Sequence, residues 1–316
     1  MGDCHGSAHS YSFGLSIIPW RRRKRARSFQ CTAHALAFPA RKPNDVNVSK
    51  SIDLVNESLV DALADSLREA EASRVAISPP SASHAELDTA TAYAIQRKNI
   101  EVRLAAGERI VGHKIGLTSE AMQQQLGVDQ PDYGALLDTM VVESGADFAV
   151  GALISPRVEA EFAFLIGQDL PPSPSRAELV HAITGVSLAM EIIDSRVADW
   201  KISLVDTIAD NASSARIVHG EFLPALASRL AALPDTVIRL SRDGVEIGSG
   251  PGSAVLGDPV TSLHWLATAI GEFGDGFAAG EIVIAGAVSA AVPLVAGSTW
   301  AVSAEGFPSS RFHTTA

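Results

Sequence analysis

One apolar segment, residues 156–166, carries two carboxylates that the folded chain must place together. Its hydrophobic residues predict a β-strand, and successive side chains of a strand point to opposite faces. Glu159 and Glu161 therefore lie on the same face. The apolar residues of the segment point to the other face: Val158, Ala160, Phe162 and Phe164. Two anions held this close need a cation, so the segment predicts a sheet with a charged site on one face.

A third acid, Glu191, stands in a second apolar run, residues 188–193. An unpaired carboxylate among apolar neighbours is costly, so Glu191 needs a cation, a hydrogen-bond network or a raised pKa. One Mg²⁺ or Mn²⁺ ion bound by Glu159, Glu161 and Glu191 would satisfy all three and leave positions for substrate oxygens and water. The alternative for the two strand glutamates is a solvated sheet face. The three acids together predict a metal-assisted enzyme.

The charge balance argues against nucleic acid and membrane partners. The chain has 316 residues, 47% of them hydrophobic, and a formal net charge of −11, although eight basic residues lie within the first 45. The rest is thus strongly acidic and would repel nucleic acid and anionic lipid. Both cysteines, Cys4 and Cys31, also lie near the N-terminus, so a disulfide scaffold is excluded for the body. The most apolar late stretch, residues 282–296, is too short to span a bilayer.

Residues 1–48 form a basic leader that we expect to be disordered. Its arginine run, residues 21–27, follows apolar residues instead of preceding them, which is the wrong order for a secretory signal. An organelle transit peptide and a basic patch are the alternatives to an unstructured tail. We assign no chemistry to the leader, and we expect a cytoplasmic protein.

The pattern of the remaining chain predicts an α+β fold. Helical spacing over residues 52–72 and 86–106, separated by a Ser/Pro linker at 78–81, gives an N-terminal helical region, residues 49–108. Gly107 ends the second helix as a left-handed cap. Short β-rich runs with no regular strand-helix alternation then predict a mixed, mostly antiparallel sheet in a catalytic domain, residues 109–308. The expected strands and helices are, respectively, 110–117, 159–166, 189–193, 237–240, 282–285 and 300–302, and 176–186 and 260–273. Residues 130–134 and 248–252 are expected to be turns.

Two further positions carry candidate chemistry. Lys114 lies in a Gly-flanked apolar strand, where it is either a surface lysine or a charge that binds a carboxylate or moves a proton. Asp132 has the setting of a structural turn residue, and beside Lys114 it becomes a candidate general base. Ser213 and Ser214 end a polar segment, residues 206–214, whose default role is backbone capping at the edge of a pocket.

Several motifs in one order resemble a known family. They are residues 112–119, 124–134, 156–161, 191–196, 199–201 and 209–214, and the similarity extends from about residue 54 to 306. The chain resembles the 2-keto-4-pentenoate hydratase and 4-oxalocrotonate decarboxylase family of the fumarylacetoacetate hydrolase-like superfamily. The resemblance implies a helical preface followed by a β-roll of the fumarylacetoacetate hydrolase C-terminal-domain type.

The resemblance also implies an activity and a set of roles. Hydratases of this family add water to 2-hydroxypenta-2,4-dienoate (2-keto-4-pentenoate) and give 4-hydroxy-2-oxopentanoate in the meta-cleavage breakdown of aromatic compounds. The positions that match the metal ligands are Glu159, Glu161 and Glu191, for Mg²⁺ or Mn²⁺. Lys114 and Asp132 match the residues implicated in proton transfer and water addition. The expected contacts to the 2-oxo-enoate carboxylate are Ser213, Ser214, Gly286 and Ala287.

Two alternatives remain open at the level of sequence. Asp132 and residues 199–201 favour a hydratase, whereas residues 212–216 and 290–293 look more like the decarboxylases, which act on 2-oxohex-3-enedioate (4-oxalocrotonate). A non-catalytic partner subunit is the second alternative, and the complete glutamate set argues against it. The resemblance also implies a homo-oligomer and allows a complex with a pathway decarboxylase or aldolase.

Overall fold

The computed structural model describes residues 45–316 except 120–122, 124–127 and 129. Two compact units separate at residue 46, and the fold below is that of the second, Asn47–Ala316. The expectations for residues 1–44, a disordered leader and a transit peptide, lie outside the described residues. So does most of residues 124–129 in the second motif.

Three helices precede the first strand, of which the sequence predicts two, α1 and α3. They are α1 (Asp45–Ser73), α2 (Pro80–Ser83) and α3 (Thr89–Ala105), and α2 occupies the expected Ser/Pro linker. Helix α3 begins at an Asp88 cap, whose carboxylate accepts a 2.8 Å hydrogen bond from the Thr91 N–H. It ends before Gly107, which has φ +101°. Leu63 and Leu67 of α1 pack with Ile95 of α3 in a small apolar cluster that also receives α6 (Leu204–Ala209).

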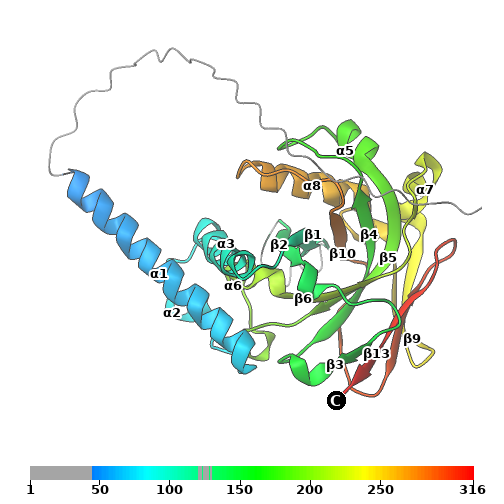
Figure 1. Ribbon diagram of the computed structural model, residues 1–316, viewed down its shortest axis with the longest axis horizontal. Coiled ribbons are helices and arrows are strands. Elements are labelled where there is room, and N and C mark those ends of the chain that lie inside the picture. Colours follow the sequence, from blue (N-terminus) through cyan, green and yellow to red (C-terminus); the bar gives the residue numbers. More distant parts are fainter. Residues whose placement is uncertain (1–44, 120–122, 124–127, 129) are drawn as a thin grey trace, which may run out of the picture. The chain divides into compact units, whose positions relative to one another are not determined.

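The larger sheet has eight strands, and Figure 1 labels β1, β2, β4, β5, β6 and β10 among them. Its strands run in the order β2-β1-β10-β4-β5-β6, while β11 pairs with β4 and β7 pairs with β5. Only β1 and β10 pair in parallel among these strands of the described chain. Their bounds are β1 Ile110–Gly116, β2 Asp132–Leu137, β4 Arg157–Ile166, β5 Ile183–Ile193, β6 Ser214–His219, β7 Leu223–Pro224, β10 Ile282–Ala287 and β11 Val292–Pro293.

A second sheet of five strands closes the other side of the core, in the order β3-β13-β12-β8-β9. Its strands are β3 Asp147–Ala149, β8 Val237–Arg242, β9 Val245–Pro251, β12 Thr299–Ser303 and β13 Ser310–Thr315. Phe162 and Phe164 of β4 share the main apolar core with Trp300 of β12 and Phe312 of β13. The apolar face of β4 is thus buried, as the alternation predicts, and its glutamates are on the other face.

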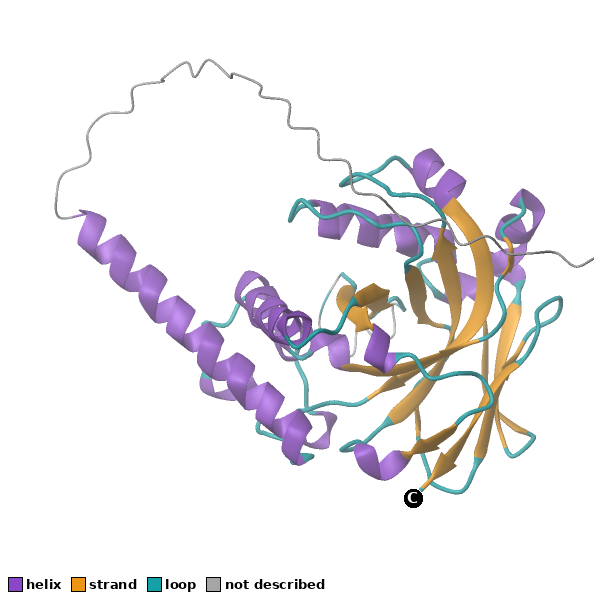
Figure 2. Ribbon diagram, viewed as in Figure 1, coloured by secondary structure: helices purple, strands orange, loops and turns teal. Residues whose placement is uncertain are grey.

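Three further helices lie around the strands (Figure 2). Helix α5 (Arg176–Ala182) begins with a Ser175 capping box, and α7 spans Ala227–Ala232. Helix α8 (Pro259–Gly271) buries Leu263 and Leu266 in the main core. The α+β class with a mixed, mostly antiparallel sheet is confirmed. The domain boundaries remain predictions, and β13 extends the second sheet past residue 308.

Three local predictions were wrong. Residues 130–134 are not a turn, because Asp132 begins β2, whose six residues are all buried beside β1. The helix expected over 176–186 stops at Ala182, because β5 lies between β4 and β6 and its continuous apolar run suits a strand buried on both faces. Residues 248–251 belong to β9 and residue 252 begins a 3-10 turn. Gly250 is needed there because a Cβ would overlap the Val288 carbonyl oxygen.

Candidate active site

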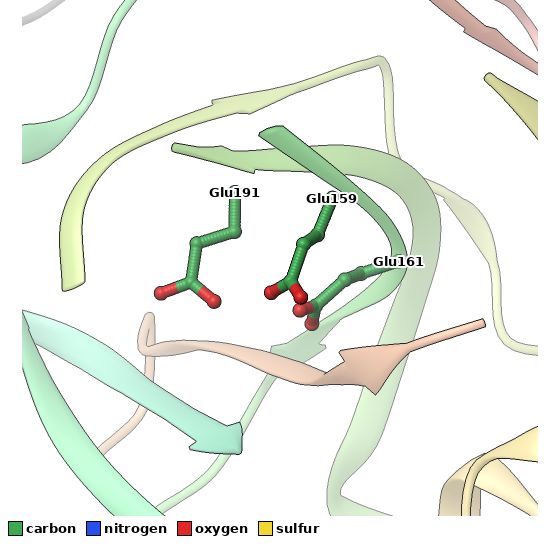
Figure 3. A group of neighbouring side chains, drawn as sticks. All are labelled: Glu159, Glu161 and Glu191. Atoms are coloured by element: carbon green, nitrogen blue, oxygen red, sulfur yellow. The ribbon is translucent and has the colours of Figure 1, made fainter. Parts of the chain in front are cut away.

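The pairing of β4 with β5 brings the three glutamates together. Glu159 lies directly opposite Glu191 in the antiparallel register, and Glu161 is the next residue on the same face of β4. One carboxylate oxygen from each lies within 4.8 Å of those of the other two. All three side chains point into the same space (Figure 3). Glu161 and Glu191 are 1% and 0% exposed, so the sheet face is not a solvated one.

Burial and mutual repulsion disfavour the charged forms of these carboxyls. Burial, followed by the charge of Glu191, raises the pKa of Glu159 to about 7. The same two effects, with the charge of Glu159, raise the pKa of Glu161 well above its ordinary value. Burial also raises the pKa of Glu191, although the Lys114 ammonium opposes this. The cluster is therefore short of positive charge.

The residues fit a hard divalent ion. Neither carboxylate oxygen of Glu191 accepts a well-formed hydrogen bond from a described residue. Glu161 Oε2 accepts a 2.8 Å hydrogen bond from the Gly286 N–H, which fixes the orientation of that carboxylate. Buried carboxylates that converge without enough donors are the environment in which Mg²⁺ and Mn²⁺ bind through oxygen.

Lys114 lies beside this cluster on β1 and is 3% exposed. Its Nζ is 3.2 Å from Glu191 Oε2 and donates a 2.9 Å hydrogen bond to the Ala212 carbonyl oxygen. Burial acts to lower the pKa of Lys114, but the carboxylates of Glu191 and Asp132 outweigh it and hold that pKa above its ordinary value. Lys114 is thus a buried ammonium and not a surface lysine.

The Ala212 carbonyl is positioned by a strained turn. Asn211, Ala212 and Ser213 have φ values of +54°, +49° and +55°. This left-handed conformation costs about 1–2 kcal/mol for a residue that has a Cβ. The Asn211 side chain exchanges hydrogen bonds of 2.8 and 2.9 Å with the Ala135 backbone of β2. Asp210, just before the turn, forms a buried ion pair with Arg196. The surrounding structure thus holds a conformation that the three residues would not adopt alone.

Asp132 begins β2 and lies opposite Gly116 in the register with β1. Its Oδ2 accepts a 3.0 Å hydrogen bond from Thr207 Oγ1, whereas Oδ1 has no partner among the described residues. A Cβ on Gly116 would lie 3.3 Å from Lys114 Nζ and closer than 3.0 Å to Asp132 Oδ1, so both functional groups gather over this glycine. Burial raises the pKa of Asp132, and Lys114 opposes the increase.

A cavity of about 290 Å³ opens onto these groups. Five of the expected site residues line it: Lys114, Asp132, Glu159, Ser213 and Ala287. Ser214 lies next to the turn and lines a small neighbouring hollow instead, and the Gly286 N–H is donated to Glu161. The Ser213 hydroxyl lies 3.5 Å from Asp210 Oδ2, to which it donates.

Comparison with known proteins decides the family. The family model described as fumarylacetoacetate (FAA) hydrolase C-terminal matches residues 110–314. The chain belongs to this family. It is 40% identical over 257 residues to the 2-keto-4-pentenoate hydratase of Paraburkholderia phymatum, which covers 81% of this chain and 97% of that protein. It is 39% identical over 254 residues to the 2-hydroxyhexa-2,4-dienoate hydratase of Comamonas testosteroni, with coverage of 79% and 96%.

A solved decarboxylase structure has a similar architecture. The 4-oxalocrotonate decarboxylase from Pseudomonas putida G7, complexed with magnesium and adipate, superposes with a TM-score of 0.77 at 32% identity. The match covers 82% of this chain and 97% of the decarboxylase. The resemblance stated from the sequence motifs is confirmed.

None of the helices in the described part of the chain has the length and apolarity needed to cross a membrane.

Three cavity residues were not singled out from the sequence: Arg157 and Trp200 lie within family motifs, and Thr207 lies in the polar segment 206–214. Thr207 holds Asp132, and Trp200 lies in the cavity wall with Arg157. Arg157 could have been found, because it precedes Glu159 by two residues and therefore shares its face of β4. Nothing in the local sequence marks Thr207, since its partner is 75 residues away in the chain.

Proposed function

We propose that the protein is a hydro-lyase that adds water to 2-hydroxypenta-2,4-dienoate to give 4-hydroxy-2-oxopentanoate in meta-cleavage catabolism of aromatic compounds. The observation that carries the proposal is the meeting of Lys114 and Asp132 with three convergent glutamates at one cavity. Relatives at about 40% identity over most of their length are named as hydratases of such dienoates.

The metal ligands in this proposal are Glu159, Glu161 and Glu191, with Mg²⁺ or Mn²⁺ as the ion. The similar decarboxylase was solved with magnesium, which supports the choice. When bound, the ion supplies positive charge that stabilises the negative charge developing on the 2-oxo group. The three buried glutamates, with Glu161 oriented by the Gly286 N–H, fix where the C1 carboxylate and the 2-oxo group of the substrate, here called the substrate head, must lie.

Lys114 and Asp132 move the protons. Asp132 Oδ1 is without a partner in the described chain, and a carboxyl with a raised pKa is a stronger base than a solvated aspartate. We assign to it the proton of the attacking water, whose oxygen bonds to C4. Lys114 delivers one proton to C5 and recovers a proton from the enol O–H, so that the dienol becomes the conjugated 2-oxo-3-enoate. After the water oxygen bonds to C4, Lys114 delivers a second proton to C3 and recovers it from Asp132, which holds the proton taken from the water. The sum of these transfers is the addition of one water molecule.

Four further residues are proposed to shape the substrate position beyond the metal. Ser213 and Ala287 line the cavity and are placed to contact the substrate. Ser214 follows Ser213 in the chain and lines a small neighbouring hollow, and Gly286 precedes Ala287 and donates its N–H to Glu161. We assign to Ser214 and Gly286 the support of Ser213 and Ala287, their neighbours in the chain.

The decarboxylase reading has one specific point in its favour, the 0.77 TM-score with a decarboxylase that was solved with adipate, a dicarboxylate. The buried, unpartnered oxygen of Asp132 favours the hydratase, because water addition needs a base beside the substrate chain. A non-catalytic partner role would not need Asp132 and Lys114 to be held together over Gly116.

Product analysis separates these readings. Metal-stripped protein is incubated with freshly generated 2-hydroxypenta-2,4-dienoate, with and without Mg²⁺, and the product is identified by NMR. We expect Mg²⁺-dependent 4-hydroxy-2-oxopentanoate. Release of CO₂ from 2-oxohex-3-enedioate without hydration of the dienoate would show a decarboxylase. Tight Mg²⁺ binding without turnover of either compound would show a partner subunit.

We also propose a cytoplasmic homo-oligomer. The exposed apolar side chains of Val102 and Leu104 on α3, with Ile110 at the start of β1, offer surface that a second copy could cover. Light scattering of the purified chain tests this, and a monomer at micromolar concentration would contradict it. Association with a pathway decarboxylase or aldolase is tested by co-purification of the two chains.

A further inference from the structure

Arg157 projects into the cavity from the same face of β4 as the metal ligands. It precedes Glu159 by two residues, so the two side chains are neighbours along the strand. Its guanidinium is close enough for its charge to act on Glu159, whose pKa it lowers against the stronger effects of burial and Glu191. Arg157 is half-buried and lines the cavity together with Lys114 and Asp132.

The Arg157 guanidinium makes neither a hydrogen bond nor an ion pair with any residue that the structure describes. Its contact is with the Trp200 ring, whose centroid lies 4.5 Å from the guanidinium carbon. Lys114, in contrast, is engaged by Glu191 and by the Ala212 carbonyl. Of these two cations in the cavity wall, Arg157 is therefore the one whose N–H donors are not engaged by a described residue and are available to a ligand.

Trp200 is held in place for this contact. Its Nε1–H donates a 3.0 Å hydrogen bond to the Ser155 carbonyl oxygen, which lies just before β4. Asp199 and Trp200 have φ values of +58° and +56°, a conformation that costs of order 1–3 kcal/mol per residue. The turn thus keeps a strained geometry that places the indole on the guanidinium, which orients its donors in advance of ligand binding.

The negative charge of the cavity also favours a role for the Arg157 guanidinium in substrate binding. Four carboxylates gather there, and a divalent ion together with the Lys114 ammonium offsets three of their charges, so one negative charge would still repel an anionic substrate. The backbone donor nearest the glutamates, the Gly286 N–H, is already taken by Glu161. A planar guanidinium offers two parallel N–H bonds to a carboxylate, the geometry that a lysine cannot provide.

We propose that Arg157, oriented by Trp200, binds the C1 carboxylate of the 2-oxo acid substrate. This rests on the proposed function, because it assumes that the substrate head lies at the glutamates. A monocarboxylate substrate has only the C1 carboxylate. Arg157 therefore binds the group that every 2-oxo-enoate contains and not the far end of the substrate chain.

Unreactive analogues test this without any turnover. The affinities of the Mg²⁺-loaded protein for 2-oxobutanoate and 2-oxoadipate are measured by calorimetry for the natural chain, Arg157→Met and Arg157→Lys. We expect Arg157→Met to lower the affinity for both ligands by a similar factor, about 10- to 100-fold, because each ligand loses the same charge-assisted hydrogen bonds to the guanidinium. Arg157→Lys should restore part of this loss, and Trp200→Leu should weaken both ligands by a smaller factor. Arg239→Met, which removes a half-exposed arginine paired with Glu246 outside the cavity, is the matched control and should leave both affinities unchanged.

Two results would overturn the inference. Loss of 2-oxoadipate affinity alone would assign Arg157 to a distal carboxylate, and unchanged affinities would remove it from binding altogether. The Mg²⁺ affinity of Arg157→Met is measured first, and we expect it not to fall. Failure of the proposed hydration is a separate outcome, because these analogues report on 2-oxo acid binding whichever reaction follows.

Discussion

Gly116→Ala is predicted to reduce the reaction rate and to spare the fold and the metal. The added Cβ would lie closer than 3.0 Å to Asp132 Oδ1, 3.3 Å from its Cγ and 3.3 Å from Lys114 Nζ. Strand β1 is fixed between β2 and β10, so the carboxylate and not the backbone must move, by about 1 Å to reach ordinary contact. A displacement of about 1 Å in a reacting group costs about 100-fold in rate.

The assay is the Mg²⁺-dependent loss of the dienoate, followed by its ultraviolet absorbance. We expect kcat to fall by about 100-fold while the Mg²⁺ affinity changes little, since no glutamate is touched. The free energy of unfolding should fall by about 1–3 kcal/mol, the usual cost of overpacking. Gly151→Ala is the control, because its Cβ would meet the nearest atom at 3.7 Å. A Gly116→Ala protein with natural kcat would refute the roles given to Asp132 and Lys114.

Three further predictions concern the metal and the turn behind it. Glu191→Gln should weaken Mg²⁺ binding by at least about 10-fold in calorimetry, because one anionic ligand is lost, and equal affinity would move the ion elsewhere. With the pKa of Glu159 at about 7 in the metal-free protein, Mg²⁺ must displace a proton below that pH. The Mg²⁺ affinity should therefore rise between about pH 6 and pH 8, and an affinity that falls over this range would contradict the assignment. Asp210→Asn leaves the buried Arg196 without its partner and should lower the free energy of unfolding by about 3–5 kcal/mol in urea. Asp199→Asn, which breaks an exposed pair, should change it by less than about 1 kcal/mol, and equal losses in the two variants would show that burial is not the cause.

The cluster of three glutamates could be predicted because it depends on the period of a strand. Alternation alone places Glu159 and Glu161 on one face, and the cost of a buried carboxylate draws Glu191 to them. The structure adds the register that sets Glu159 opposite Glu191, which no local pattern encodes. Strand β4 was predicted correctly for the same reason, since one of its faces is wholly apolar.

The surroundings of Lys114 could not be predicted, because they depend on tertiary contacts that override local preference. Asp132 looks like a turn residue, yet it begins a buried strand because β1 pairs with it. The three left-handed residues of the turn at 211–213 include Ala212, a type that rarely adopts this conformation. Their geometry is imposed by the Asn211 contacts to β2 and by the ion pair at Asp210.

The most direct test of the account is the position of the ion itself. Crystals grown with Mn²⁺ are measured at the manganese absorption edge, and the anomalous difference map locates the metal. We predict one strong peak with an oxygen of Glu159, Glu161 and Glu191 each at about 2.0–2.3 Å, beside Lys114 and open to the cavity. A peak bound by other residues, with these glutamates left as they are, would contradict the central claim that the glutamates on β4 and β5 form a metal-dependent active site.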